Sequence, residues 1–125
     1  QLDGVFDKLD LRAACKAAAG EDLVAATSHQ SEFCLENVEG TLVGFWTPAY
    51  ARTLNVSGYH LHFISADRKQ GGHLLNLSAR ELLATFHVET DFHMAIPETQ
   101  AFLEADLRSD PSQALDVAEK TRQQD

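Results

Sequence analysis

The sequence has little of several things, and each shortage excludes a class of protein. Two cysteines in 125 residues are too few for the disulfide framework of a small secreted domain. No apolar run approaches the roughly 20 residues that span a bilayer, and the first residues do not resemble a signal peptide. Low-complexity segments and internal repeats are absent too. We therefore expect a folded domain that has no membrane as its partner.

Basic residues are also scarce. Ten Lys and Arg stand against 19 Asp and Glu, which gives a formal net charge of -9. Such a chain repels phosphate backbones, so we expect no nucleic-acid partner. Both cysteines, Cys15 and Cys34, are expected to be reduced, as is usual in the cytoplasm. The expected location is therefore cytoplasmic.

The composition favours an ordered domain. Hydrophobic residues make up 44% of the chain and charged residues 23%, and the length suits one domain with a core of its own. There is no initiator Met, and residues 1–6 look like the end of a strand that enters a turn. We expect residues 1–125 to be one portion of a longer protein that lacks its N-terminal part.

Alternating apolar and polar residues predict several strands. Residues 2–11 suggest a short hairpin with Asp3-Gly4 as its turn, and the Ala-rich stretch 13–26 reads as helical or irregular on either side of Gly20. Two strands, 31–35 and 41–46, follow and are joined by a turn at 36–40. Further strands are predicted at 59–64, 73–77, 83–89 and 92–96.

Two helices are predicted near the C-terminus. Residues 98–107 follow Pro97 and carry apolar side chains at helical spacing. Asp110-Pro111 then has the residue types of an N-cap and a first helical position. The predicted fold class is α+β: a mostly antiparallel or mixed β-sheet, or a barrel-like β domain, with two C-terminal helices.

The most informative feature is a set of three histidines. His60 and His62 lie two apart in a predicted strand, so their side chains share one face, while Tyr59, Leu61 and Phe63 share the other. A third histidine, His73, follows a Gly-Gly pair that permits a tight return. Three imidazoles can occupy three corners of a metal's coordination sphere and leave room for water or substrate, as catalytic zinc sites require.

The spacing alone leaves alternatives open. His60 and His62 can instead be half-buried strand residues that hydrogen-bond to their neighbours. A metal set of this kind also fits cupin-like and carbonic-anhydrase-like β scaffolds, and a cupin-like site would need a carboxylate nearby, for which Asp67 is the close candidate. Zinc is the favoured ion, although other divalent transition metals suit imidazole ligands.

Longer stretches around these histidines resemble the α-acetolactate decarboxylase family. The resemblance is nearly gapless over residues 40–77 and runs more loosely to both ends. It is carried by EGTLVGFWTPAY (39–50), NVSGYHLHFIS (55–65), Asp67-Arg68 and GGHLL (71–75). It covers the C-terminal half of family proteins, which are roughly twice this length.

The resemblance implies roles for particular residues. His60, His62 and His73 would bind a zinc ion. The segment GVFDKLDLR (4–12) is similar to the family segment whose arginine meets the substrate beside the metal, which implies that role for Arg12. The segment LDVAEK (115–120) resembles the one whose glutamate folds back onto the site, which implies that role for Glu119. By residue type alone, Arg12 would be a surface salt bridge and Glu119 part of a solvated helix face.

The implied reaction is the decarboxylation of 2-acetolactate to acetoin and carbon dioxide. The zinc ion would act as a Lewis acid on the hydroxyl and ketone oxygens and so stabilise the enediolate. Arg12 would orient the carboxylate, and Glu119 would protonate the enediolate. The family also uses a glutamate from its N-terminal half, which this sequence does not supply, and its members form homodimers. A catalytically inactive fragment is therefore a second alternative to the cupin-like one.

The remaining histidines and two aromatic residues have no such role. His87 and His93 lie in apolar runs and are expected to be core or edge residues, as is usual for strand histidines. His29 matches no family motif. Phe45 and Trp46 lie in a predicted strand and are expected in the core rather than in a substrate platform.

Overall fold

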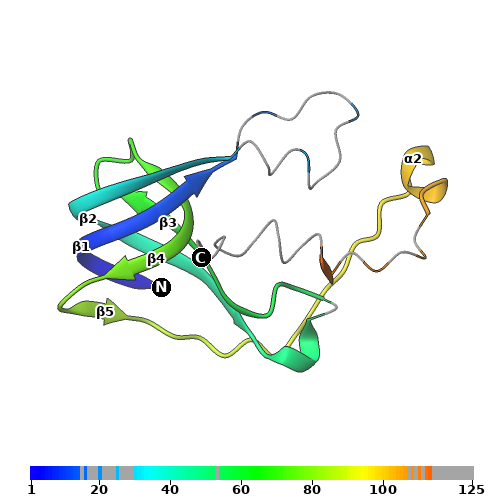
Figure 1. Cartoon of the computed structure of the whole chain (residues 1–125). Coiled ribbons are helices and arrows are strands. Elements are labelled where there is room, and N and C mark those ends of the chain that lie inside the picture. Colours follow the sequence, from blue (N-terminus) through cyan, green and yellow to red (C-terminus); the bar gives the residue numbers. More distant parts are fainter. Residues whose placement is uncertain are drawn as a thin grey trace.

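The fold is a small antiparallel β-sheet that is followed by an extended segment. The computed structural model describes residues 1–14, 16, 20, 25, 30–52, 54–106, 108, 110, 112 and 113. The elements in chain order are β1 (Leu2–Ala13), β2 (Ser31–Thr47), η1 (Ala49–Ala51), β3 (Gly58–Ser65), β4 (Gly71–Ser78), β5 (Leu82–Ala84) and α2 (Gln100–Leu103) (Figure 1). All five strand pairs are antiparallel, which confirms the mostly antiparallel β prediction.

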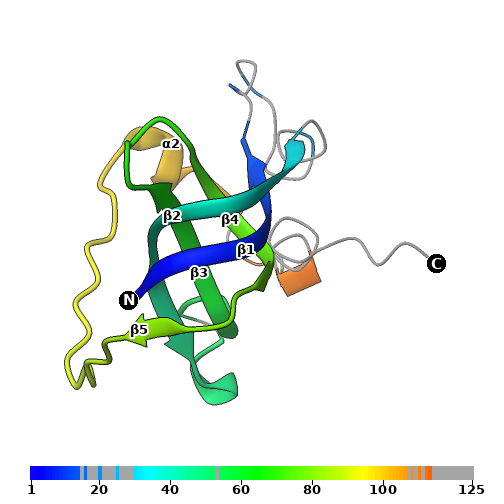
Figure 2. The same ribbon diagram turned by 90° about the vertical axis from the view of Figure 1, so that its left-hand side faces the viewer.

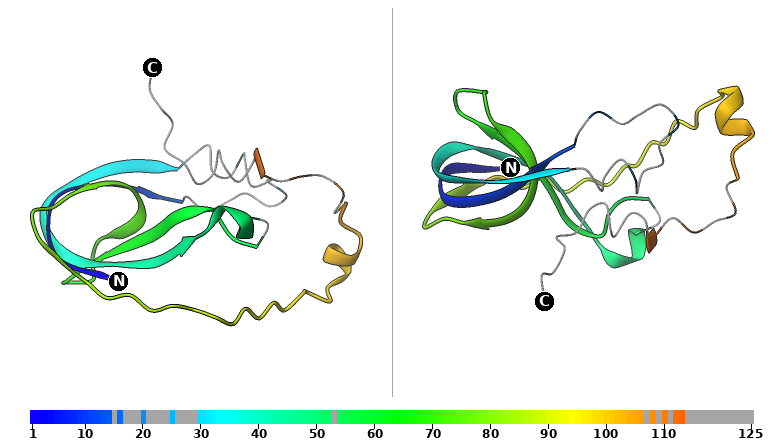
Figure 3. Two further views of the ribbon diagram at one scale, coloured as in Figure 1. Left: turned by 90° about the horizontal axis from the view of Figure 1, so that it is seen from below. Right: turned by 45° about the horizontal axis from the view of Figure 1, so that its top comes forward.

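The pairings among the first four strands form a closed circuit. β1 pairs with β2 along one edge and with β4 along the other, and β3 joins β2 to β4. Figure 2 and the left view of Figure 3 show how these strands curl around one another. β5 pairs with the first residues of β1, beyond the stretch that β4 occupies. The circuit leaves β1 with neighbours on both of its edges.

A compact apolar cluster fills the inside of this circuit. Its fully buried members come from β1, β2 and β3, and the rings of Phe6 and Phe63 meet edge to face with their centroids 5.5 Å apart. Partly buried leucines, such as Leu61 and Leu74, pack around it. The buried hydrophobic residues are Phe6, Leu9, Leu11, Leu42 and Phe63. This cluster joins β1, β2 and β3 across the circuit.

Two predicted turns do not exist. The expected hairpin over 2–11 is instead the single strand β1, and the expected turn at 36–40 lies inside the single strand β2. The reason is long-range pairing: β1 and β2 run side by side from Leu2 opposite Leu42 to Ala13 opposite Ser31. A ladder of this length outweighs the local turn preference of Asp3-Gly4. Asp3 itself lies in the ladder opposite Thr41. The Thr41 hydroxyl also donates a 2.6 Å hydrogen bond to the Asp3 carboxylate.

The histidine strands agree with prediction, and the strands after them do not. The strands predicted at 59–64 and 73–77 are confirmed as β3 and β4. The strand expected at 83–89 is reduced to β5, and the strand expected at 92–96 is absent. Residues 86–96 follow an extended course in Figure 1 but form no ladder with the strands that the structure describes. The alternating pattern there lacks the neighbouring strand that a ladder needs.

The prediction of two C-terminal helices is not confirmed. The helix expected over 98–107 is the four-residue α2, whose first turn is capped by the Thr99 hydroxyl accepting from the Phe102 amide at 3.3 Å. Four residues are one turn, too short to be stable without packing. The helix expected after Asp110 lies almost entirely outside the described residues, as does most of 13–26. The helices described are all too short or too polar to cross a membrane.

The core makes a direct prediction about stability. Replacing Phe6 by Ala removes a fully buried ring and leaves a cavity next to Phe63. We expect the free energy of unfolding to fall by about 3–5 kcal/mol. The matched control is Phe86→Ala, because that ring is 79% exposed and its loss should change stability by about 0.5 kcal/mol or less. Urea unfolding followed by circular dichroism measures both, and equal losses would contradict this description of the core.

Candidate metal centre

Alternation along β3 separates the histidines from the core. Phe63 is 3% exposed and packs inside, whereas His60 and His62 project from the opposite face of the same strand. Gly44 of β2 lies against this strand, and any side chain on Gly44 would collide with the His60 carbonyl oxygen. A glycine here therefore lets β2 approach the histidine strand closely.

The three imidazoles form a compact triangle. The Nε2 atoms of His60 and His62 are 3.1 Å apart, and the three ring centroids lie 5.0 to 5.2 Å from one another. One potential ligand nitrogen from each of His60, His62 and His73 can be chosen so that all lie within 4.8 Å. Two nitrogens that bind the same tetrahedral zinc at 2.0–2.1 Å are about 3.3 Å apart. The residues therefore fit a metal ion with only small side-chain adjustments.

Pairing of β3 with β4 brings the third histidine into this triangle. His73 lies directly opposite His62, and residues directly opposite one another share a face of the sheet. Gly72 precedes it, at a point where an added Cβ would lie 2.7 Å from the carbonyl oxygen of Arg12 on β1. The Gly-Gly pair is thus needed for the close approach of strands. Its predicted role in the tight return is wrong, because both glycines lie within β4 and the left-handed residue of the return is Arg68, with φ 59°.

Arg12 lies in the same row as these histidines. It is directly opposite His73 in the pairing of β1 with β4, so the row runs from His62 through His73 to Arg12. The residue is only 7% exposed, unlike the surface salt bridge that its type alone suggests. Burial of a guanidinium costs free energy unless its N–H donors are hydrogen-bonded. An arginine buried at this position is therefore more than a surface residue kept for solubility.

Sequence reasoning missed several neighbours of the site. On β2, Val43 is directly opposite His62 and Phe45 is directly opposite His60, so both apolar side chains flank the imidazoles. On the other side of Arg12, Glu32 is its cross-strand partner in β2. Strands were predicted around Glu32, Val43 and Phe45, whereas the strand that carries Arg12 was expected as a hairpin over 2–11. Only the register between the strands reveals which residues are neighbours.

The burial predicted for four other residues is wrong, and two further residues lie outside the part of the chain that the structure describes. Phe45 and Trp46 are 62% and 61% exposed, so the expectation that they lie in the core is wrong. His87 and His93 are exposed in the extended segment after β5, which contradicts core or edge positions. Glu119 and His29 lie outside the described residues.

Asp67 does not join the histidines. Among the described residues, the group of potential metal ligands consists of the three histidines. Asp67 instead accepts a 2.7 Å hydrogen bond from the Ser65 hydroxyl and a 3.1 Å bond from the Lys69 amide, inside the turn between β3 and β4. The cupin-like alternative, which needed this carboxylate beside the metal, therefore has no support.

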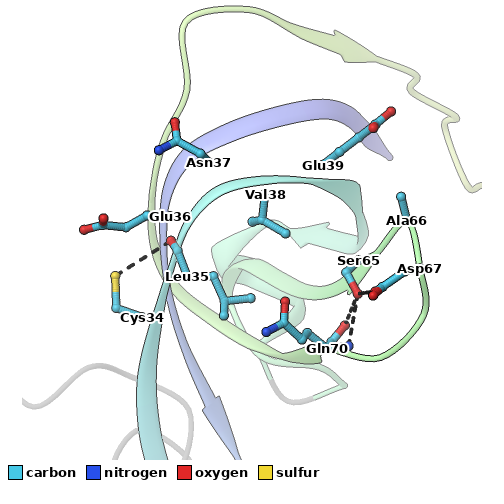
Figure 4. A pocket seen from close by; sticks show the side chains of 10 residues that line it. All are labelled: Cys34, Leu35, Glu36, Asn37, Val38, Glu39, Ser65, Ala66, Asp67 and Gln70. Atoms are coloured by element: carbon cyan, nitrogen blue, oxygen red, sulfur yellow. Dashed lines mark hydrogen bonds between the residues drawn. The ribbon is translucent and has the colours of Figure 1, made fainter.

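A hollow of about 460 Å³ lies beside this turn, apart from the histidines. Figure 4 shows Ser65, Asp67 and Gln70 on one side of it and residues of β2 on the other. Its lining is Cys34, Leu35, Glu36, Asn37, Val38, Glu39, Ser65, Ala66, Asp67 and Gln70. The hydrogen bond from Ser65, followed by that from the Lys69 amide, lowers the pKa of Asp67 below its ordinary value. These contacts give the lining a structural task, which is to hold the turn.

The fold and the site together define a class of protein: an antiparallel β domain with three histidines at metal-ligand spacing on the outer face of its strands. The family model for alpha-acetolactate decarboxylase matches residues 1–109. The chain therefore belongs to the alpha-acetolactate decarboxylase family, as the motifs around the histidines predicted.

Curated relatives agree with this assignment. The chain is 38% identical to an alpha-acetolactate decarboxylase of Brevibacillus brevis over 123 residues, which are 98% of this chain and 43% of that protein. It is 36% identical to the Bacillus subtilis strain 168 protein of the same name over 118 residues, which are 94% of this chain and 46% of that one. The chain thus spans about half the length of these relatives.

Solved structures of the family have the same fold over this region. The crystal structure of alpha-acetolactate decarboxylase from Bacillus subtilis strain 168 superposes with a TM-score of 0.83 at 33% identity, over 96% of this chain and 52% of that one. Acetolactate decarboxylase from Bacillus subtilis subspecies spizizenii gives a TM-score of 0.87 at 35% identity, over 94% and 52% of the two chains.

The turn that joins the histidine strands makes a prediction about pH. Because the pKa of Asp67 is lowered in the folded state, its contribution to stability is present above the unfolded value of about 3.9 and is lost as the pH falls through the lower folded value. We expect Asp67→Asn to be less stable than the wild type at pH 6, and this difference to be smaller at pH 3. Urea midpoints at both pH values measure it. Asp91→Asn, which removes an exposed carboxylate from the extended segment, is the control and should show no such pattern.

Proposed function

We propose that this chain carries the metal centre of an acetolactate decarboxylase, which converts 2-acetolactate to acetoin and carbon dioxide. The observation that carries the proposal is the triangle of His60, His62 and His73 with Arg12 in the same row, in a chain of this family. The relatives' printed names supply the reaction class. Because the chain spans about half of their length, the activity of the whole protein is part of the proposal.

The three histidines would hold a zinc ion. Their nitrogens are the ligand type that zinc favours, and their spacing fits its coordination distances. When bound, the ion would supply Lewis acidity toward the hydroxyl and ketone oxygens of 2-acetolactate. The histidines contribute by fixing the ion on a rigid pair of strands, with coordination positions left for the substrate.

Arg12 would bind and orient the substrate carboxylate. Its planar guanidinium can form two parallel hydrogen bonds to a carboxylate, and its low exposure places it where water competes poorly. A carboxylate held in one orientation leaves as carbon dioxide along a fixed direction. Val43 and Phe45 would contact the alkyl groups of the substrate, because both are apolar and flank the imidazoles.

Glu119 would deliver the proton that completes acetoin. This role rests on the resemblance of residues 115–120 to the family's C-terminal segment, as no structural detail is described there. A carboxylic acid that protonates one face would fix the configuration of the product. The remaining proposals are a homodimer and a cytoplasmic location, which rest on the family and on the scarcity of cysteine.

Metal binding is the first test. We expect the purified chain to bind one zinc ion, and His62→Ala to weaken binding by about 100-fold or more, because it removes one of the three imidazoles of the triangle. Competition against a chromophoric chelator measures the affinity. His93→Ala is the matched control, since it removes an exposed histidine outside the triangle. Equal affinity of the His62→Ala variant and the wild type would refute the centre.

Turnover is the second test. We expect the zinc-loaded chain to release acetoin from 2-acetolactate, and Arg12→Lys to lower kcat/KM by about tenfold or more, equivalent to about 1.4 kcal/mol, because lysine lacks the two-pronged donor. The control is Arg80→Lys, whose side chain is 89% exposed and pairs with Asp7 away from the histidines. A zinc-loaded chain without turnover would contradict activity in this chain by itself.

A further inference from the structure

The segment after β5 has the side-chain pattern of a strand without a neighbouring strand among the described residues. We call residues 86–96 the arm. Apolar side chains occupy almost every even position and polar ones the odd positions from 87 to 93. The large apolar members are all more than half exposed: Phe86 79%, Val88 81%, Phe92 59%, Met94 60% and Ile96 63%. Such a row in water is unfavourable, by roughly 25 cal/mol for each Å² of apolar surface.

The arm continues a ladder that has already begun. β5 pairs with β1 from Leu82 opposite Gly4 to Ala84 opposite Leu2. One step further, Gln1 and Thr85 exchange two 2.9 Å backbone hydrogen bonds. Among the described residues, Gln1 is the last partner in this ladder, while the arm runs on in an extended course, as the left view of Figure 3 shows.

The faces of the arm are set by this register. Side chains alternate, so the even residues of the arm lie on the same face as Leu82, which packs against the core cluster. The apolar row of the arm is therefore a continuation of the core face of β5. Its partner must offer a free backbone edge together with an apolar surface on that face.

We propose that the arm becomes a β-strand by pairing, antiparallel, with a segment of the polypeptide that the longer family members carry outside the region matched by this chain. The length of these relatives supports that occupant, because about half of each lies outside the match. The register supports it too, since the occupant must extend the line of β1 beyond Gln1.

A second copy of this chain is a less suitable occupant. Two arms paired with each other form a two-stranded ribbon, which is marginally stable and leaves its apolar face uncovered. A strand from a sheet with its own apolar face meets both needs of the arm.

The register predicts which backbone amides of the arm are bonded. In an antiparallel ladder, residues two apart along a strand direct their N–H groups to the same neighbour. Gln1 and Thr85 form a doubly bonded pair, so the amides of His87, Glu89 and Asp91 would donate to the occupant. The amides of Phe86, Val88 and Thr90 would point to the other side.

The test compares two chains by residue-resolved hydrogen exchange. One is the 125-residue chain, and the other is the same chain extended at Gln1 by the segment that precedes the matched region in the Bacillus subtilis relative. In the extended chain we expect exchange at His87, Glu89 and Asp91 to slow by about tenfold or more, with less slowing at Phe86, Val88 and Thr90. Protection at Leu9 in both chains shows that the core stays folded.

Matched variants separate pairing from unspecific covering. Val88→Glu combined with Phe92→Glu places charges on the apolar face of the arm and should abolish the slowing in the extended chain. Glu89→Gln combined with His93→Gln changes only the polar face and should preserve it. The proposal is overturned by equal exchange in the two chains, by equal protection of odd and even amides, or by concentration-dependent protection in the 125-residue chain, which would assign the arm to a second copy.

Discussion

The arrangement of the site depends on one constraint, the register in which β3, β4 and β1 pair. His62, His73 and Arg12 come from three different strands and lie in one row because each is directly opposite the next. A slip of a single residue in either pairing would turn the side chains of one strand to the other face. The positions of all three residues are therefore as well defined as the backbone ladder.

The buried core protects this register. Leu61 and Phe63 pack inward from the same strand that carries His60 and His62 outward, so a slip of β3 would bury imidazoles and expose a phenyl ring. Gly44 and Gly72 contribute by allowing neighbouring backbones to come close at the histidine strands. The candidate metal centre and the hydrophobic core are thus opposite faces of one set of strands.

Sequence patterns were reliable where a strand alternates. The histidine strand and its partner were predictable, because local periodicity determines both. The return between them was expected at Gly71-Gly72, but both glycines belong to β4 and the left-handed residue of the return is Arg68. The lengths of β1 and β2 were not. Their local turn signals, such as Asp3-Gly4, yield to eleven cross-strand pairs between residues far apart in sequence. Reasoning from local sequence includes none of those pairs. It therefore predicted two strands where β2 is one, and a hairpin where β1 is a single strand.

The solvent exposure of individual side chains was the second property that the sequence did not predict. Phe45 and Trp46 were expected in the core because residues of their type are usually buried, yet both are largely exposed on β2. Residue type gives the preference for burial but not the surface available to satisfy it. The arm illustrates the same point, since its alternating pattern is that of a strand although the described residues offer it no neighbour.

The sequence by itself determined the family, the candidate ligand residues and the sharing of one face by His60 and His62, because these follow from motifs and from the period of a strand. Only the tertiary structure decided that His73 completes the triangle, that Arg12 lies beside it in a buried position, and that Val43 and Phe45 flank the imidazoles. The physical reason is that the side of a strand on which a side chain lies follows from the local backbone. The register between strands instead arises from hydrogen bonds and core packing between residues distant in the chain.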